Sequence, residues 1–401
     1  MTHDPQIASQ GGSAAEVFGA FLKLGLTAFG GPIAHLGYFR EAFVARRGWL
    51  SDAAYADLVA LCQFLPGPAS SQVGVALGVM RAGWLGGLAA FVGFTLPSAL
   101  ILLVLGLTAA NLTGPVGSGI LDGLKIAAVA IVAQAVLGMA RSLCPDRERA
   151  AIAAGAVVLL AFLPPALAMI GAIILGGILG LGLGRGTGSI LGQPLTIAVT
   201  KLHAGLALAT FVLLFLGLPL LASQSQTGAL LDGFYRAGTL VFGGGHVVLP
   251  LLQAEVVAPG WVTPDQFLMG YAAAQAVPGP LFTFAAYLGA VLGPEPNGVL
   301  GAALALTALF LPGFLLLIAV LPYWESLRAN RKTQAAMQGA NAAVVGILGA
   351  ALYDPVFTSA IGGMPDFALA LALFVALTAW KAPPWLVVLF AGLGGVLLAQ
   401  L

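Results

Sequence analysis

The chain has 401 residues, of which 60% are hydrophobic and only 8% are charged, and its mean hydropathy is +1.01. Soluble domains contain about 25% charged residues, so this composition excludes a soluble globule. A formal net charge of +1 excludes a nucleic-acid binder, which needs a basic face to meet phosphates. The 55 Gly and 24 Pro residues lie among apolar runs, which is typical of polytopic helical membrane proteins. The two cysteines, Cys62 and Cys144, are too few for a disulfide framework or a four-Cys zinc site.

Residues 1–14 contain no Lys or Arg and no apolar core, which predicts a cytoplasmic tail and not a secretory signal. Nine later segments are apolar enough for membrane spans, which need about 20 residues, although some of the nine are short. They are residues 83–107, 118–140, 148–163, 165–184, 196–222, 298–320, 334–352, 366–381 and 384–401.

Four further apolar segments are interrupted by clusters of Gly and Pro. The clusters are Phe29-Gly30-Gly31-Pro32 in residues 15–45, Pro66-Gly67-Pro68 in residues 52–80, Phe242-Gly243-Gly244-Gly245 in residues 230–256, and Pro278-Gly279-Pro280 in residues 265–292. Proline lacks an N–H and clashes with the preceding turn, while glycine adopts positive φ at little cost, so each cluster should break its helix into two halves. Broken backbone at membrane depth persists only where protein or a watery cavity covers it. The breaks are therefore candidate site elements.

The breaks reveal an internal repeat. Residues 25–31 match residues 238–244 at an offset of 213, and Gln63 with its Pro-Gly-Pro matches Gln275 with its Pro-Gly-Pro at an offset of 212. We therefore predict a first copy at residues 15–184 and a second at residues 228–401. The linker, residues 185–227, contains the apolar segment at about 196–222.

Basic residues predict the orientation of each copy, because short cytoplasmic loops accumulate Lys and Arg. In copy one, the loops at 40–47 and 141–149 are basic and the loop at 108–117 is not. In copy two the pattern is reversed: loops 257–264 and 353–365 have no basic residue, and residues 328–332 do. The pattern predicts two copies of inverted topology, as in many secondary transporters.

The predicted fold class is an all-α polytopic membrane protein of two inverted-topology repeats. In the topology that satisfies every loop, the two broken segments of each copy are re-entrant helical hairpins, which gives about nine full spans plus four half-helix hairpins. In the alternative, with about 13 hydrophobic segments, some broken segments cross the membrane fully.

Four of the 16 basic residues lie within apolar segments, namely Lys23, Lys125, Lys201 and Arg236. A charge at the bilayer centre costs about 2.5 to 3.5 kcal/mol, so such residues are candidate functional residues. Lys23 and Arg236 are mates in the repeat, and we expect them to approach the pseudo-two-fold axis from opposite sides.

Local pairing is the alternative for these charges. Asp232 precedes Arg236 by four residues and Asp122 precedes Lys125 by three, which is the helical spacing of an ion pair. Lys201 lies near the end of its segment, where it can extend to the membrane interface.

Polar side chains also lie close to the breaks. His246 follows Gly245 directly, and His35 lies three residues beyond Pro32; a role in anion or proton binding and a structural role are equally compatible with the sequence. Gln63 and Gln275 each precede a Pro-Gly-Pro by three residues, where an amide either binds substrate or ties down the broken backbone.

Enzyme motifs are missing from the sequence. The Gly-rich run at 180–188 lacks the Gly-Lys-Ser/Thr ending of a nucleotide loop, and there is no His-Glu-x-x-His pair or nucleophile elbow. We therefore expect a protein that is not an enzyme and has no cofactor or metal.

The paired motifs closely resemble those of the long-chain, two-domain chromate ion transporter family. The resemblance lies in residues 21–32, 46–50, 63–68, 242–246 and 275–280, and it spans nearly the whole chain. It implies a bacterial inner-membrane carrier that exports chromate, an anion with the charge and shape of sulfate, and so confers chromate resistance.

The residues offer a chemistry that suits such an anion. A doubly charged oxyanion needs cations and N–H donors in place of water, and half-helix N-termini provide free N–H groups at the positive end of a dipole. We expect backbone donors at Ile33, Ala69, Ser70, His246 and Leu281. The candidate substrate-binding residues are Lys23, Gly30, Gly31, Pro32, Gln63, Pro66, Gly67, Pro68, Ser70, Ser71, Lys125, Arg236, Gly243, Gly244, Gly245, His246, Gln275, Pro278, Gly279, Pro280 and Thr283.

Rocking of one copy against the other would alternate access to this site. The alternatives are a passive anion channel and a carrier of another oxyanion such as sulfate. Coupling to protons, to a counter-anion or to the membrane potential alone stays open, because few acids, chiefly Asp57, Asp122 and Asp232, face the membrane interior. The expected partners are the oxyanion and the lipid bilayer, with a homodimer as an open alternative.

Overall fold

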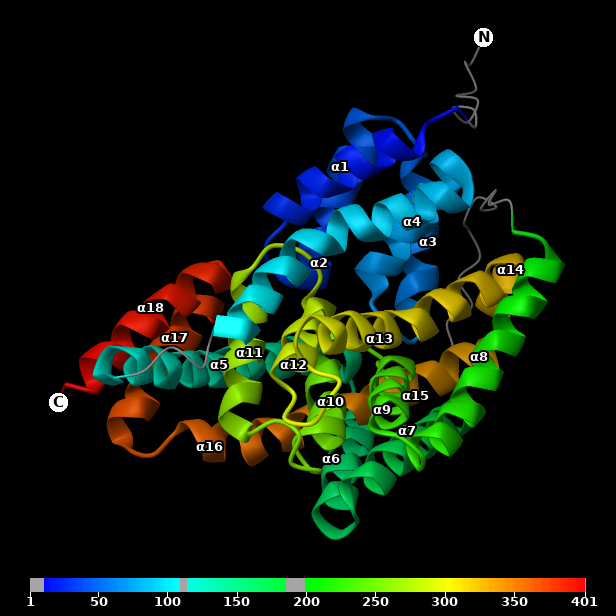
Figure 1. The fold of residues 1–401 in the computed structure, drawn as a ribbon. Coiled ribbons are helices and arrows are strands. Elements are labelled where there is room, and N and C mark those ends of the chain that lie inside the picture. The colour runs from blue at the N-terminus through cyan, green and yellow to red at the C-terminus, as the bar shows by residue number, and fades with distance from the viewer. Residues whose placement is uncertain (1–10, 109–113, 185–198, 401) are drawn as a thin grey trace.

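The structure is a computed structural model that describes residues 11–108, 114–184 and 199–400 (Figure 1). The described part of the chain is helical and contains no strand. In copy one and the linker the elements are α1 (Ala14–Thr27), α2 (Gly31–Phe39), the π-helical η1 (Arg40–Arg46), α3 (Asp52–Phe64), α4 (Ala69–Thr108), α5 (Gly114–Leu143), α6 (Arg147–Phe162), α7 (Pro165–Leu183) and α8 (Lys201–Ala222). In copy two they are α9 (Gln226–Thr239), η3 (Gly245–Val247), α10 (Val248–Val256), α11 (Pro264–Ala276), η4 (Leu281–Thr283), α12 (Phe284–Val291), α13 (Gly298–Val320), η5 (Leu321–Tyr323), α14 (Trp324–Ala329), α15 (Arg331–Ala351), η6 (Leu352–Phe357), α16 (Thr358–Ala360), α17 (Met364–Thr378) and α18 (Pro384–Leu398).

Among the described residues, five helices are long and apolar enough to cross a membrane, and they indicate a membrane protein. They are Ala69–Thr108, Val116–Leu143, Lys201–Ala222, Gly298–Ala329 and Arg331–Ala360, and shorter apolar helices occur at Leu167–Leu183, Leu281–Val291, Met364–Thr378 and Pro384–Leu398. The predicted count of nine full spans stays a prediction, because several of the expected spans are these shorter helices. Most of the predicted tail and the first part of the predicted linker, residues 185–198, lie outside the described residues.

Each of the four interrupted segments consists of two helices separated by its Gly and Pro cluster. The half-helices before the breaks, α1, α3, α9 and α11, have 13 or 14 residues each. At 1.5 Å per residue they are about 20 Å long, against roughly 30 Å for the hydrocarbon core of a bilayer. None of these half-helices spans a bilayer alone.

After each break the chain returns to the end from which it came. In copy one, Glu16 at the start of α1 pairs with Arg81 at 3.2 Å, and the Arg81 guanidinium lies 5.4 Å from the centre of the Trp49 ring. The backbone leaves helical geometry at Ala82 and Gly83, which separates the half-helix at 69–81 from the long helix that follows. The start of α1, the loop before α3 and residue 81 therefore lie together.

The matching positions of copy two also lie together. The N–H of Gly293 donates to the carbonyl of Trp261 at 2.9 Å, which joins the loop before α11 to the end of α12. Thr227, at the start of α9, lines a hollow with Glu295 and Asn297.

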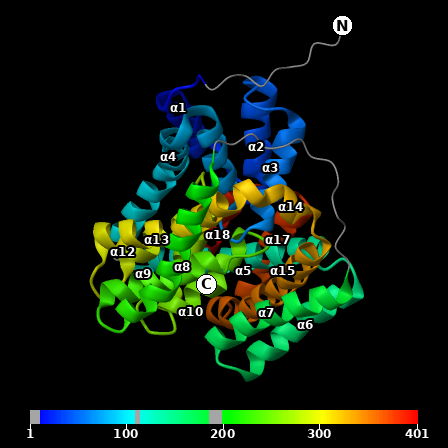
Figure 2. The ribbon, with the colours of Figure 1, turned by 90° about the vertical axis from the view of Figure 1, so that its right-hand side faces the viewer.

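The long helices of the two copies are interleaved. α5 packs against α18, and α15 packs against α7, so each copy contributes a helix to the other's half of the bundle (Figures 1 and 2). A Cβ on Gly123 would lie 2.1 Å from the carbonyl oxygen of Ala391, and a Cβ on Gly339 would lie 2.0 Å from that of Gly176. Only small residues allow helix backbones to approach this closely, as is usual between membrane helices.

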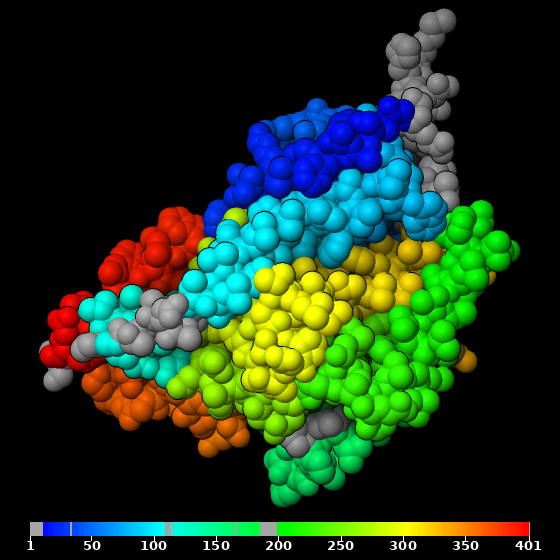
Figure 3. All heavy atoms as spheres, viewed as in Figure 1, coloured from blue at the N-terminus to red at the C-terminus, as the bar shows by residue number. Residues whose placement is uncertain are grey.

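The first hairpins form a separate aromatic core. Phe21, Phe39, Phe43 and Phe94 are fully buried and their rings contact one another at centroid distances of 4.8 to 6.4 Å. Figure 3 shows the cyan part of α4 between dark blue α1 and yellow α13. The long part of α4 thus connects the core of the copy-one hairpins to the rest of the bundle.

Candidate functional site

The Pro-Gly-Pro break of each copy is hydrogen-bonded to the Phe-Gly-Gly break of the other copy. The N–H of Gly67 donates to the carbonyl of Val241 at 2.8 Å, and the N–H of Gly279 donates to the carbonyl of Ala28 at 2.9 Å. The two bonds are equivalent under the repeat, because the accepting residues differ by the same offset of 213 as the Phe-Gly-Gly motifs. The four breaks therefore meet at one junction between the copies.

Glycine is required at the centre of both Pro-Gly-Pro turns. Gly67 and Gly279 have φ angles of +119° and +104°, a region that other residues adopt only with strain. Each also contacts the long helix of the other copy, Gly67 against Gly313 and Gly279 against Ser98. Gln72 strengthens the first of these contacts, because its amide donates to the carbonyls of Pro66 at 3.1 Å and Gly313 at 2.8 Å.

The two Phe-Gly-Gly breaks also touch. A Cβ on Gly245 would lie 3.2 Å from the ring of Pro32, so Gly245 is packed against the start of α2. The next residue, His246, places Nδ1 2.8 Å from the hydroxyl of Tyr271 and 3.4 Å from Nε2 of Gln275. His246 and Gln275, both predicted site residues, are thus brought together, and Tyr271 joins them.

Gln63 differs from its repeat mate. Gln275 is buried and contacts His246, whereas Gln63 is exposed. The position equivalent to His246 in copy one is Ile33, which cannot accept such a contact. His35, the nearby histidine of copy one, is fully buried with Nε2 3.2 Å from the carbonyl oxygen of Ala28, and it serves the backbone at the end of α1.

Helices that begin at the breaks differ from those that begin at the ends of the hairpins. The outer N-termini are capped by hydroxyl side chains, namely Ser13 for α1, Ser51 for α3, Ser225 for α9 and Thr263 for α11. The inner N-termini follow Gly30, Pro68, Gly244 and Pro280, none of which has a side chain that can accept an N–H. The first N–H groups of the inner helices are left for another acceptor, at the positive end of the helix dipole.

The hydroxyl residues that follow the Pro-Gly-Pro turns are buried. The Thr283 hydroxyl donates to the carbonyl of Pro280 at 2.7 Å, whereas the Oγ of its repeat mate Ser71 has no hydrogen-bond partner in the described part of the chain. Ser70 is also buried. Asn341 Oδ1 is likewise without a partner among the described residues, and it lies 3.5 Å from the position of a Cβ on Gly243. Asn341 was not predicted from the sequence, because a single uncharged polar residue within the apolar segment 334–352 carries no distinctive signal.

Lys23 and Arg236 have different surroundings, and their expected approach to the pseudo-two-fold axis stays a prediction. Lys23 is exposed on α1, which packs against α4, while Arg236 lies on α9, which packs against α8, α10 and α13 (Figures 1 and 2). Arg236 contacts Asp232, and its Nε lies 3.7 Å from Oε1 of Glu255. Lys23 forms no ion pair within the part of the chain that the structure describes. The two residues are mates in sequence, but they lie on helices with different neighbours.

Lys125 is engaged in local ion pairs. Its Nζ lies 2.7 Å from Asp122 and 3.2 Å from Asp265, and the two carboxylate side chains are 58% and 68% exposed. Lys125 therefore lies near an end of the bundle and joins α5 of copy one to α11 of copy two. Lys201, the first residue of α8, is exposed at a helix end, as expected for a lysine that extends to the membrane interface.

A second ion pair between the copies was not predicted from the sequence. Asp57 on α3 accepts hydrogen bonds from Arg328 at 2.6 Å and from the Trp324 indole at 3.2 Å. The carboxylate and guanidinium side chains are only 8% and 14% exposed. The one available signal was an acid within an apolar segment, and nothing in the sequence names its partner 271 residues away.

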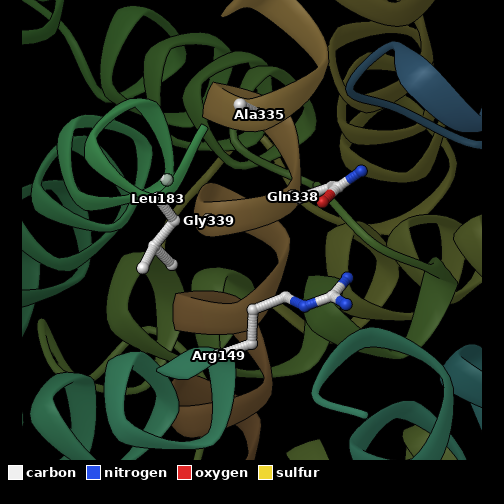
Figure 4. A pocket seen from close by; sticks show the side chains of 6 residues that line it. Arg149, Leu183, Ala335, Gln338 and Gly339 are labelled. Carbon is white, nitrogen blue, oxygen red and sulfur yellow. The ribbon is translucent and has the colours of Figure 1, made fainter. Parts of the chain in front are cut away.

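Two hollows among the described residues lie away from the breaks. One, of about 10 Å³, is lined by residues of three helices, and Figure 4 shows Arg149 of α6, Leu183 of α7 and Gln338 of α15 around it. Its volume suits one water molecule at most, and Arg149 is held by Asp146 at 2.6 Å. A larger one, of about 390 Å³, lies beside Asn297 in a loop of copy two.

Comparison with known proteins shows one family. The model of the family described as "Chromate transporter" matches the chain twice, at residues 15–181 and 228–396. The chain is 30% identical to the chromate transport protein of Pseudomonas aeruginosa, over 95% of this chain and 91% of that protein. It is 28% identical to a probable chromate transport protein of Synechococcus elongatus, over 94% and 93%, and 29% identical to the chromate transport protein of Cupriavidus metallidurans, over 82% and 79%. No solved structure matches.

Proposed function

The chain belongs to the chromate transporter family, and we propose that it is a secondary transporter that exports chromate across the inner membrane by alternating access. The family is one of transporters, and relatives of nearly the same length are named as chromate transport proteins. Chromate is a tetrahedral dianion like sulfate, so its site must replace a strongly held shell of water.

One observation carries the proposal: four uncapped helix N-termini begin at a junction that reciprocal hydrogen bonds hold together. Gly67 and Gly279 fix this junction from opposite copies. Uncapped N–H groups are ready-made anion donors, because the dipole favours negative charge and no side chain competes for them. All four helix ends come from one chain, so the proposed site is complete within a monomer.

Side chains at the junction would complete the shell of donors. The Ser71 hydroxyl is buried without a partner, and His246, Tyr271 and Gln275 form a connected polar group in copy two. Charge-assisted hydrogen bonds to an anion contribute about 1.5 to 3 kcal/mol each, so a few of them offset much of the lost hydration.

The inverted arrangement has support from both sequence and packing. The family model matches each copy separately. Asp57 brings Arg328 to the end of the molecule where Arg40 pairs with Asp52, so basic residues of both copies gather at one end. The end formed by Asp122, Asp265 and Gly293 has the non-basic loops. We assign the basic end to the cytoplasm.

Alternating access would use the two ion pairs that join the copies at opposite ends. Asp57 binds Arg328 between α3 and the start of the α14–α15 segment, while Asp265 binds Lys125 between α11 and α5. Both contacts join the helix before a Pro-Gly-Pro break to an element of the other copy, although the residues that form them are not repeat mates. We propose that opening toward one side separates one pair and keeps the other.

Transport by purified protein in liposomes tests the proposal, with the pH gradient and the membrane potential set independently. We expect chromate flux that saturates with concentration and accumulation against a chromate gradient when a driving gradient is applied. Accumulation excludes the alternative of a passive channel. Competition by sulfate measures how far the site distinguishes the two dianions, and preferred transport of sulfate would replace chromate as the substrate.

Cysteine labelling tests the topology. In a protein that lacks Cys62 and Cys144, single cysteines at residues 47 and 260 should be labelled from opposite faces of the membrane. Labelling of both from the same face would exclude the inverted arrangement.

A further inference from the structure

Arg236 contacts two carboxylates at once, although a single one would balance its charge. Asp232 lies one turn earlier on α9, and Oε1 of Glu255 on α10 lies 3.7 Å from the Arg236 Nε. The side chains of the two acids are only 8% and 21% exposed. With all three groups ionised, this half-buried cluster has one excess negative charge, which is costly away from water.

Within the described part of the chain, no further cation pairs with Asp232 or Glu255. α9 packs against α8, α10 and α13, and α10 also packs against α15. The sequence of α13 has no ionisable residue, and Glu255 is the sole one of α10. The ionisable groups on the other packed elements are Lys201 and His203 in the first turn of α8, and Arg331 and Lys332 in the first turn of α15. His246 on η3, which also packs against α10, contacts Tyr271 and Gln275, and Tyr235 is the remaining ionisable residue of α9. The Tyr235 hydroxyl donates to the Phe211 carbonyl at 3.1 Å and is thereby occupied.

Copy one builds the same hairpin without these acids. Lys23 stands in the place of Arg236, Gly19 in the place of Asp232, and Ala42 or Phe43 in the place of Glu255. The two carboxylates are therefore not needed to form the hairpin. In copy two, the absence of a side chain at Gly233 makes room for the Glu255 carboxylate, because a Cβ on Gly233 would lie 3.1 Å from its Oε2.

We propose that Asp232 and Glu255 together hold one exchangeable proton, and that Arg236 couples this proton to the transported anion. The inference rests on the proposed function, since it needs an anion at the junction. Arg236 lies in the last turn of α9, six residues before Phe242 of the Phe-Gly-Gly break. The carboxylates and the anion compete for its guanidinium. A proton on the carboxylate pair weakens their hold on Arg236, which then turns its charge toward the anion.

Proton and anion binding are consequently linked with positive sign. Anion affinity rises as pH falls, by at most about tenfold per pH unit for one linked proton. Linkage is reciprocal, so anion binding must raise the affinity for the proton by the same factor, and a proton is taken up from solution when the anion binds. Proton and anion would then cross the membrane in the same direction, and the imposed gradients would determine that direction.

Proton uptake by the purified protein tests this coupling directly. Chromate is added to wild-type protein in weakly buffered detergent solution over a range of pH, and the change in pH is recorded. Protonation of free chromate is the same for every variant and cancels in the comparison. We expect uptake of up to about one proton per bound anion for the wild type, and none for Glu255→Gln, whose chromate affinity should no longer vary with pH.

Two variants separate this role from a structural one. Glu41→Gln removes a carboxylate from the equivalent helix of copy one, where Glu41 forms an exposed pair with Arg46, and it should keep the wild-type proton uptake. Glu255→Asp keeps the acid and should retain the uptake even if Glu255→Gln is poorly folded. Chromate binding by the wild type without proton uptake, or uptake unchanged in Glu255→Gln, would overturn the inference alone. A wild type that binds no chromate would overturn the proposed function as well.

Discussion

Replacement of Gly279 by alanine tests the junction between the copies. Gly279 has a φ of +104°, where an alanine is strained by about 1 to 2 kcal/mol. Its Cβ would lie 2.7 Å from the Ser98 Oγ and 3.2 Å from the Phe94 carbonyl oxygen, and overpacking of this kind costs about 1 to 3 kcal/mol. We expect Gly279→Ala to lower the free energy of unfolding by about 2 to 5 kcal/mol.

The two contributions can be separated, because the nearest atom belongs to a side chain. Ser98→Ala removes that Oγ together with its hydrogen bond to the Thr95 carbonyl at 3.1 Å. The double variant Gly279→Ala with Ser98→Ala should recover the overpacking part, about 1 to 2 kcal/mol, and keep the backbone strain. The equivalent Gly67→Ala has no such rescue, since its Cβ would meet the backbone of Gly313 at 3.0 Å.

Equilibrium unfolding of the detergent-purified variants, followed by tryptophan fluorescence, measures these differences. Gly138→Ala is the matched control, because Gly138 is a helical glycine of α5 with no other atom within 4 Å of a Cβ, and alanine there should stabilise by up to about 1 kcal/mol. Equal stability of the Gly279→Ala and Gly138→Ala proteins, or a double-mutant cycle without coupling, would refute the close contact between the copies.

Three further predictions concern the breaks and the charges. Pro68→Ala or Pro280→Ala should let the inner helix extend and use its own N–H groups, lowering chromate transport by about tenfold or more at equal membrane abundance; unchanged transport in both would remove the anion role of these ends. Asp57→Asn should lower the free energy of unfolding by about 3 kcal/mol, because it leaves the buried guanidinium of Arg328 without this carboxylate. Lys125→Asn should lower it by under about 1 kcal/mol, because the carboxylates beside Lys125 are exposed. The reverse order would contradict the burial of the Asp57–Arg328 pair. If the charge of Lys23 contributes to anion binding, as the repeat predicts, Lys23→Arg should keep chromate flux in liposomes, and Lys23→Gln should lose it at normal insertion. Equal flux in both variants would exclude such a role for Lys23.

The breaks were predictable because Gly and Pro act through the local backbone. Glycine permits positive φ and proline lacks an N–H, so clusters that contain glycine, most of them with proline, interrupt the helices at Gly30, Gly67, Gly243 and Gly279 as predicted. Single prolines such as Pro97 and Pro312 instead lie inside helices. The long apolar helices were also predictable from local sequence, since α13 begins and ends at the limits of the apolar run 298–320. Outer caps such as Ser13 and Ser225 likewise obey local hydrogen-bonding rules.

Side-chain partners were not predictable, because they depend on how helices rotate and interleave. Lys23 and Arg236 are mates in sequence, yet α1 and α9 turn them toward different surroundings. The contact of Glu255 with Arg236 was not predicted, because Glu255 lies near the end of α10 and reaches Arg236 only because α10 returns along α9. The partner of Asp57 comes from the interleaving of the two copies, which no spacing in the sequence reveals.

The two copies agree in backbone and differ in side chains, and this division bears on mechanism. Gly67 and Gly279 make equivalent hydrogen bonds, which suits a process in which the copies exchange equivalent conformations. A perfectly symmetric site, however, would have nothing with which to couple the anion to a second ion. The acids around Arg236 and the His246 group occur in copy two alone. We therefore expect substitutions of the backbone breaks to impair transport from either copy, and substitutions of these polar groups to alter its pH dependence from copy two only.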